Sequence, residues 1–179
     1  VTGVQTCALP IYLARVKGLR TFLGSMAGPW TGWLLLRSLE TLKIRMEQQA
    51  ANAEKVALFL DAHKKIEKVY YPGLLQPQDK QFAIYKKQNT SPGAMLSFDI
   101  IGGEHEAFTF LNNLKLIKLA VSLGSTESLA EHPATMTHAG VEDNHRLAMG
   151  INSNMVRLSV GIENYKDIIW DISQALDAV

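Results

Sequence analysis

The sequence predicts an α/β chain of the α+β kind, in which a long helix is followed by a mostly antiparallel four-stranded sheet with helices on one face. Two patterns favour this class. Apolar residues recur every three to four positions over 28–63, and no proline follows Pro29 until Pro72. Beyond this segment, short strand-like runs alternate with helical runs, and their separations are too long for simple hairpins.

The composition excludes several classes of protein. The 179 residues are 47% hydrophobic and carry 18 Lys and Arg against 17 Asp and Glu, so no charge excess marks a partner for nucleic acid or an anionic membrane. The only cysteine, Cys7, excludes an internal disulfide and fits a reducing compartment. Without a secretory signal or a membrane-spanning run, we expect a cytoplasmic protein.

The first residues do not fit a folded domain. The string VTGVQTCALPI at 1–11 resembles a translated sequencing-adaptor scar, so we predict that it is not native. The chain does not begin with Met, and the residues after position 11 read as the continuation of a structure that starts upstream. We therefore expect residues 12–27 to be the tail of a larger domain that lies upstream.

The following elements are predicted in chain order. The helix over 28–63 begins at Pro29, which suits a first helical turn, and a bend is expected near Ala50 to Asn52. The predicted strands, which end at turn-forming residues such as Gly102-Gly103, are 65–71, 93–101, 116–122 and 155–162. The predicted later helices are 76–87, 104–114, 142–149 and 164–178.

An arginine stands inside the last predicted strand. Side chains alternate between the two faces of a strand, so Leu158, Val160 and Ile162 share one face and Arg157 lies on the other. A guanidinium matches a carboxylate with two parallel hydrogen bonds and keeps its charge. The pattern alone leaves two interpretations open, a solvated surface arginine or an anion-binding group.

A second polar group closes the preceding strand. Ser122 stands at its end, and Gly124 allows the backbone to turn sharply there. Neighbouring strands would bring Ser122 and Arg157 to one edge of the sheet. The pattern is typical of an ordinary turn and is also compatible with a carboxylate site.

No metal or phosphate motif is predicted. His132, His138 and His145 are separated by six and seven residues, which matches no standard zinc spacing, so we assign them structural or solvent-facing roles. Glycine-rich phosphate fingerprints are absent from the sequence.

Five strings carry a family resemblance. They are LRSLETLKIRM (36–46), VYYPGL (69–74), GAMLSFDIIGG (93–103), SLGSTESLAEHPATMTH (122–138) and VRLSVGIE (156–163). In this order they resemble the C-terminal portion of the Cys/Met-metabolism pyridoxal-phosphate (PLP) enzymes, the trans-sulfuration group of cystathionine γ-synthase, cystathionine γ-lyase and methionine γ-lyase. The resemblance implies the C-terminal part of a fold type I PLP enzyme, with 12–27 ending the large cofactor domain, 28–63 linking, and 64–179 binding the substrate carboxylate.

The resemblance also implies roles for single residues. Arg157 falls where the family binds the substrate α-carboxylate, Ser122 where a serine assists through its amide or hydroxyl, and Thr137 where it supports the arginine. Val121 occupies a position that varies between acidic and apolar residues, and its apolar side chain resembles methionine γ-lyase. Arg20 is expected to approach a neighbouring subunit, although the triplet around it departs from the methionine γ-lyase pattern, so the exact reaction stays open.

The same resemblance implies that PLP is bound mainly upstream of this chain. The lysine that forms the Schiff base lies there, so no catalytic residue is assigned here and the chain alone is expected to be inactive. The intact protein would act on methionine, cystathionine or activated homoserine by γ-elimination or γ-replacement, as a dimer of dimers. The alternative is a non-catalytic amino-acid-binding regulatory module or an assembly domain.

Overall fold

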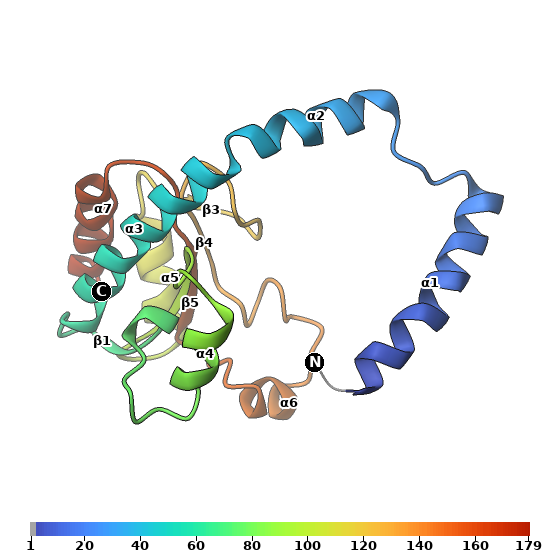
Figure 1. Cartoon of the computed structure of the whole chain (residues 1–179). Helices are drawn as coiled ribbons and strands as arrows, with labels where there is room; N and C mark the ends of the chain where they lie inside the picture. The colour runs from blue at the N-terminus through green and yellow to red at the C-terminus, as the bar shows by residue number, and fades with distance from the viewer. Residues whose placement is uncertain (1–2) are drawn as a thin grey trace. The chain divides into compact units, whose positions relative to one another are not determined.

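A computed structural model describes residues 3–179, without the side chains of residues 3–9 and 11. The chain divides into two compact units, with the boundary between Leu42 and Lys43 (Figure 1). Residues 1–2 and the Cys7 side chain lie outside the described part, so the non-native origin of 1–11 stays a prediction. None of the described helices is long and apolar enough to cross a lipid bilayer.

The first unit is helical. It contains α1 (Gly3–Leu23) and α2 (Pro29–Glu40), and α3 (Leu42–Asp61) belongs to the second unit from its second residue onward. The single helix predicted over 28–63 is wrong, because it is broken at Thr41, whose φ of −105° and ψ of 1° leave the helical region. A β-branched residue favours such a break, but the apolar period continues across it, so the pattern concealed it. The bend expected at Ala50 to Asn52 is absent, since α3 is continuous there.

A mixed sheet forms the centre of the second unit. Its strands are β1 (Ile66–Tyr70), β2 (Met95–Ile100), β3 (Lys118–Leu119), β4 (Leu129–Glu131) and β5 (Met155–Ser159). The order is β1-β2-β5-β4-β3, and every pair is antiparallel except the parallel pair β3 and β4. The prediction of four strands is corrected to five, because β4 has three residues, all buried, and therefore shows no alternation.

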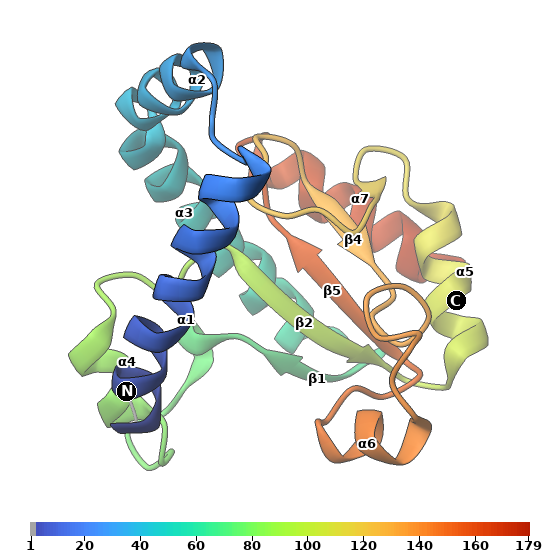
Figure 2. The ribbon, with the colours of Figure 1, turned by 90° about the vertical axis from the view of Figure 1, so that its right-hand side faces the viewer.

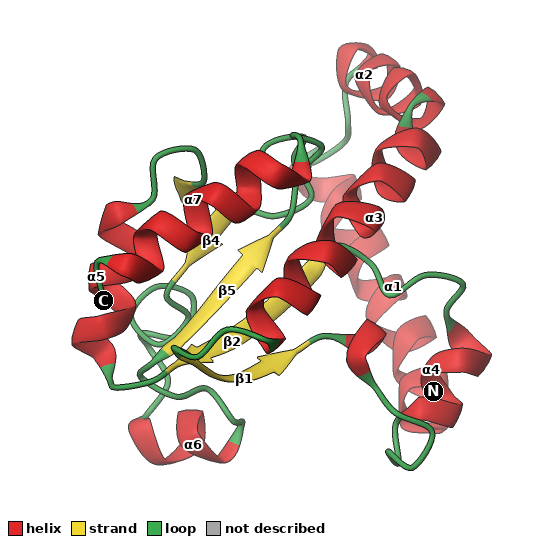
Figure 3. Cartoon of the chain, turned by 90° about the vertical axis from the view of Figure 1, so that its left-hand side faces the viewer, coloured by secondary structure: helices red, strands yellow, loops and turns green. Residues whose placement is uncertain are grey.

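Helices cover one face of this sheet. Figure 3 shows α3, α5 (Glu104–Asn113) and α7 (Tyr165–Asp177) in front of the strands, and Figure 2 shows the strands from the other side, with these helices behind them. The predicted arrangement of helices on one face is confirmed. The connections contain a 3₁₀ turn, η1 (Pro72–Leu74), and two short helices, α4 (Phe82–Gln88) and α6 (Asp143–Ala148).

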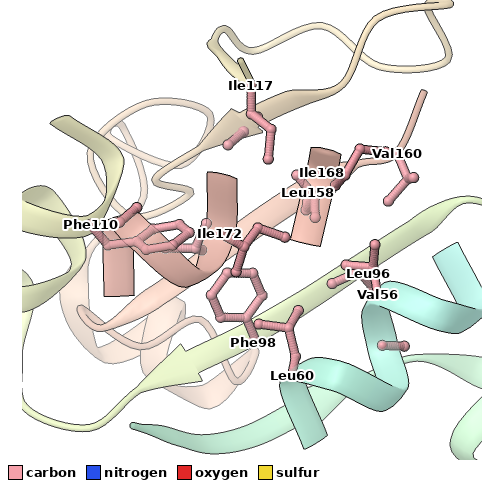
Figure 4. Packing of buried hydrophobic residues seen from close by; sticks show 14 of the residues in the cluster. Val56, Leu60, Leu96, Phe98, Phe110, Ile117, Leu158, Val160, Ile168 and Ile172 are labelled. Atoms are coloured by element: carbon pink, nitrogen blue, oxygen red, sulfur yellow. The ribbon is translucent and has the colours of Figure 1, made fainter. Parts of the chain in front are cut away.

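The core lies between these helices and the sheet (Figure 4). Paired strand residues such as Phe98 and Val156 point into it, and the Phe98 ring meets the Phe110 ring of α5 edge-on, with centroids 5.6 Å apart. Helix α3 adds Val56 and Leu60, which are fully buried. Burial of one face of β2 and β5 assigns their alternate residues to the opposite face.

A buried carboxylate attaches the start of β3 to α7. Asp171 has no exposed surface, and it accepts backbone N–H bonds from Lys115, Leu116 and Ile117 at 2.8, 2.9 and 2.8 Å. Three amides of an irregular segment are thereby satisfied inside the protein. This carboxylate positions the chain that leads to Val121 and Ser122.

Replacing Asp171 is therefore expected to destabilise the second unit. Asp171→Ala leaves three N–H groups, which are buried or partly buried, without this acceptor, which should cost about 2–4 kcal/mol in the free energy of unfolding. Urea unfolding followed by circular dichroism measures this cost. The control is Asp177→Ala, at an exposed position of the same helix, which should change stability by less than about 0.5 kcal/mol. Equal effects of the two changes would contradict the proposed attachment.

Candidate functional site

Arg157 lies on the face of β5 that points away from the core. The strand register aligns it with Ser97 of β2 and Glu131 of β4, and Ser97 is aligned with Tyr70 of β1. Four polar side chains thus form one row across four strands, on the face without α3, α5 and α7. The predicted alternation is confirmed for Leu158 and for Val160 just beyond β5, which are buried, but it is wrong for Ile162, which is 41% exposed because the strand ends at Ser159.

The Arg157 guanidinium is held on several sides. Its Nη1 forms an ion pair with Glu131 Oε1 at 2.6 Å, and its Nη2 donates to the carbonyl oxygens of Val121 at 2.8 Å and Ser122 at 3.2 Å. Its side chain is 20% exposed. A freely solvated arginine does not fit this geometry, since the guanidinium is fixed in orientation and most of the side chain is buried.

Three of the other predicted site residues contact Arg157 or its ion-pair partner. Ser122 and Val121 contact Arg157 through their backbone carbonyls, while their side chains are exposed. The Thr137 hydroxyl donates to Glu131 Oε1 at 3.1 Å, so Thr137 touches the ion-pair partner of Arg157. Arg20 belongs to α1 of the first unit and is exposed.

A small hollow lies beside Arg157. It measures about 150 Å³ and is lined by residues of β1, β2 and β5, namely Tyr70, Met95, Leu96, Ser97 and Arg157. The Tyr70 hydroxyl donates to Asp99 Oδ2 at 2.8 Å, and burial together with this hydrogen bond raises the pKa of Tyr70 to about 12. Tyr70 is therefore a neutral hydrogen-bond donor at physiological pH.

A buried polar network holds the loop that contains Ser122. The Glu163 carboxylate accepts from the backbone N–H and the hydroxyl of Ser128 at 2.6 and 2.9 Å, and the same hydroxyl accepts from the Gly161 N–H at 2.9 Å. The Ser159 hydroxyl accepts from the Gly124 N–H at 3.0 Å. Residues 122–128 are thereby tied to the chain that leaves β5.

Helix α3 contributes two buried amides to this network. Asn52 Nδ2 donates to the carbonyl oxygens of Gly161 and Glu163 at 3.1 and 2.7 Å, and Gln49 Nε2 donates to that of Ser125 at 2.6 Å. Both side chains are at most 1% exposed. The same helix that builds the core thus also fixes the loop around the site.

The histidines take no part in a metal cluster within the described part of the chain. His132 is buried, and its ring nitrogens lie 2.8 Å from the Thr135 hydroxyl and 2.7 Å from the Ser153 carbonyl oxygen. Such contacts fit the predicted structural role. No group of three His, Cys, Asp or Glu side chains able to hold a metal was found among the described residues.

Sequence reasoning missed one member of the site, Glu131. Its charge and position are visible in the string SLAEHP, but its role depends on pairing with Arg157 across two strands. Because β4 was not predicted, its register against β5 could not be anticipated. Only the sheet places these two residues opposite each other.

Comparison with known proteins gives the family. Residues 1–177 match the family described as Cys/Met metabolism PLP-dependent enzyme. The chain belongs to this family. The resemblance read from the five sequence strings, including the fold type I context, is therefore confirmed.

Members of the Cys/Met metabolism family with curated names or solved structures agree with this assignment. An L-methionine gamma-lyase of Fusobacterium nucleatum subsp. polymorphum is 48% identical over 165 residues, which cover 92% of this chain and 41% of the relative. The cystathionine gamma-lyase of Lactobacillus plantarum, solved with L-serine, superposes with a TM-score of 0.84 at 37% identity, over 95% of this chain and 44% of that one.

A third relative is a putative O-acetylhomoserine (thiol)-lyase of Campylobacter jejuni. Its structure contains a pyridoxyl-lysine monophosphate and superposes with a TM-score of 0.80 at 37% identity, covering 87% of this chain and 37% of that one. This chain spans about two fifths of the length of the family members it matches.

Gly161 provides a test of the loop network. An added Cβ there would collide with the Thr126 carbonyl oxygen and the Glu163 carboxylate. Gly161→Ala should therefore displace the loop, at a cost of about 1–3 kcal/mol in the free energy of unfolding. Hydrogen exchange at the Gly124 and Ser128 amides should become faster.

The control is Gly140→Ala, since an added Cβ at Gly140 meets no atom within 4 Å. It should leave both amides as protected as in the parent chain. If Gly161→Ala left their exchange unchanged, the loop would not depend on this close approach.

Proposed function

We propose that this chain is the C-terminal part of a PLP-dependent enzyme that acts on sulfur amino acids by γ-elimination or γ-replacement. In this proposal the chain supplies the site for the substrate α-carboxylate. Its main support is Arg157, a partly exposed side chain whose guanidinium is fixed by Glu131, Val121 and Ser122 on the face of the sheet that points away from the helices, in a chain of the Cys/Met metabolism family.

Arg157 would bind the carboxylate and orient the substrate. A guanidinium offers a planar set of donors that matches two carboxylate oxygens, and its charge is permanent. Since Glu131 and two backbone carbonyls restrict rotation of the guanidinium, a bound carboxylate would inherit a defined orientation. This orientation would direct the substrate Cα–H bond, so Arg157 would contribute to rate as well as to affinity.

The cofactor contacts are assigned to the rest of the protein. Pyridoxal phosphate, when bound, withdraws electrons from the substrate α-carbon. The described lysines are exposed except for Lys65, which is half-buried and donates from Nζ to the Leu176 carbonyl at 2.8 Å. Arg157 forms its polar contacts with Glu131, Val121 and Ser122 and with none of the described lysines, so the residues of this chain fit the substrate carboxylate rather than a covalent link to the cofactor.

Substrate choice is proposed to involve Val121. Its side chain is 52% exposed and directly precedes Ser122, while its carbonyl holds Arg157. The named relatives divide between methionine, cystathionine and O-acetylhomoserine. Within the proposal, an apolar residue at this position favours methionine over cystathionine. Cystathionine has a second amino group, and Val121 offers no negative charge to bind it.

The proposal also covers the substrate, the partners and the cellular location of the enzyme. A small amino acid is the proposed substrate, further copies of the same protein are the proposed partners, and Arg20 is the proposed contact to a neighbouring subunit. A single cysteine in 179 residues supports a cytoplasmic location. The relatives are named as lyases, which gives no support to a non-catalytic regulatory or assembly domain.

The proposal is tested in the longer protein that contains this chain. That protein should bind PLP, with its characteristic absorbance, and release a 2-oxo acid from methionine or cystathionine. Arg157→Ala should raise KM, because the carboxylate loses its charged partner. The loss of about 2–4 kcal/mol of binding free energy corresponds to a fall in kcat/KM of roughly 30- to 1,000-fold.

Lys118→Ala is the matched control, since Lys118 is an exposed cation on β3. Its kcat/KM should stay within about twofold of the parent. Failure to bind PLP would refute the enzyme proposal, whereas unchanged kinetics in Arg157→Ala would refute the assignment of the carboxylate site.

A further inference from the structure

Glu131 is the unusual feature of the candidate site. It lies directly opposite Arg157 in the register of β4 and β5, and its carboxylate forms the 2.6 Å ion pair with the guanidinium. Its side chain has no exposed surface. A group proposed to attract an anion therefore already has a buried anion beside it.

The contacts of Glu131 separate it from any ligand of Arg157. Its Oε1 receives Arg157 Nη1 and the Thr137 hydroxyl, and its Oε2 is buried without a hydrogen-bond partner among the described residues. Because Glu131 is inaccessible and Arg157 is 20% exposed, an incoming carboxylate would touch Arg157 but not Glu131. The negative charge of Glu131 would nevertheless repel this carboxylate, since a buried charge is poorly screened by solvent and salt.

We propose that Glu131 is a positioning residue that also weakens the carboxylate site. It fixes the guanidinium and partly neutralises its charge, so that substrate and product carboxylates are bound in a defined orientation but released readily. This inference rests on the proposed function of Arg157. Without Glu131 the guanidinium would keep its full charge beside two neutral carbonyls, and it would retain a product that keeps its carboxylate.

The test measures binding of a carboxylate that cannot react. In the longer protein loaded with PLP, the dissociation constant of acetate is measured by ligand-observed NMR for the parent, Glu131→Gln and Arg157→Ala. Glutamine keeps the size and an acceptor oxygen for Arg157 and Thr137 but removes the charge. Glu131→Gln should tighten acetate binding at least about fivefold, because the repulsion between two carboxylates is lost.

Two further variants make the result specific. Glu131→Ser also removes the charge and should shift the affinity in the same direction, which keeps the test usable if glutamine packs poorly. Glu127→Gln removes an exposed carboxylate from the same segment and should leave acetate binding unchanged.

The direction of the change distinguishes the outcomes. Damage to the structure would weaken binding, so tighter binding cannot come from a merely structural role. Unchanged or weaker acetate binding in both folded Glu131 variants would overturn the inference, while loss of binding in Arg157→Ala would still support the proposed function. If the parent bound no acetate through Arg157, the proposed function and the inference would both fail.

Discussion

The packing of one face of β5 against the helices is the constraint on which the site depends. Val156 and Leu158 are pressed into the core against α3, α5 and α7, so the residue between them must point to the other face. That residue is Arg157. The apolar contacts on the core face of β5 therefore also hold the Arg157 side chain on the opposite face. A shift of the register by one residue would place a guanidinium in the core, which makes this register strongly determined.

Buried polar groups fix the conformation of the loops around Arg157, which apolar packing alone does not determine. The loops around Arg157 have no regular backbone pairing of their own, and buried side chains satisfy their amides and carbonyls. Asp171 holds the segment before β3, and Glu163 and Asn52 hold the segments after β3 and β5. Such groups are costly to bury unless each finds a partner, so the network has few alternative arrangements.

The pair formed by Arg157 and Glu131 joins stability and binding. As a buried ion pair it contributes orientation more than net stability, because desolvation offsets much of the attraction between the charges. In the proposed enzyme the same pair sets how strongly a carboxylate is held. Fixed geometry with moderate affinity suits a site that must bind a substrate and then release a product with the same anionic group.

The amino-acid sequence by itself determined much of the framework. The apolar periods predicted most strands and helices and the outward direction of Arg157, because period two and period 3.6 are local properties of the backbone. The five family strings led to the family. The sequence did not reveal the break at Thr41, since the apolar pattern continues through it, or the three-residue strand β4, which is too short and too buried to alternate.

Only the tertiary structure decided the partner of Arg157. Glu131 is 26 residues away along the chain, and no local pattern links the two. They meet because β4 pairs with β5 in one register, and because Asp171 and the Glu163 network hold the segments that bring Val121 and Ser122 to the same guanidinium. Residue types and periods are written in the sequence, but contacts between distant segments exist only once the sheet has formed.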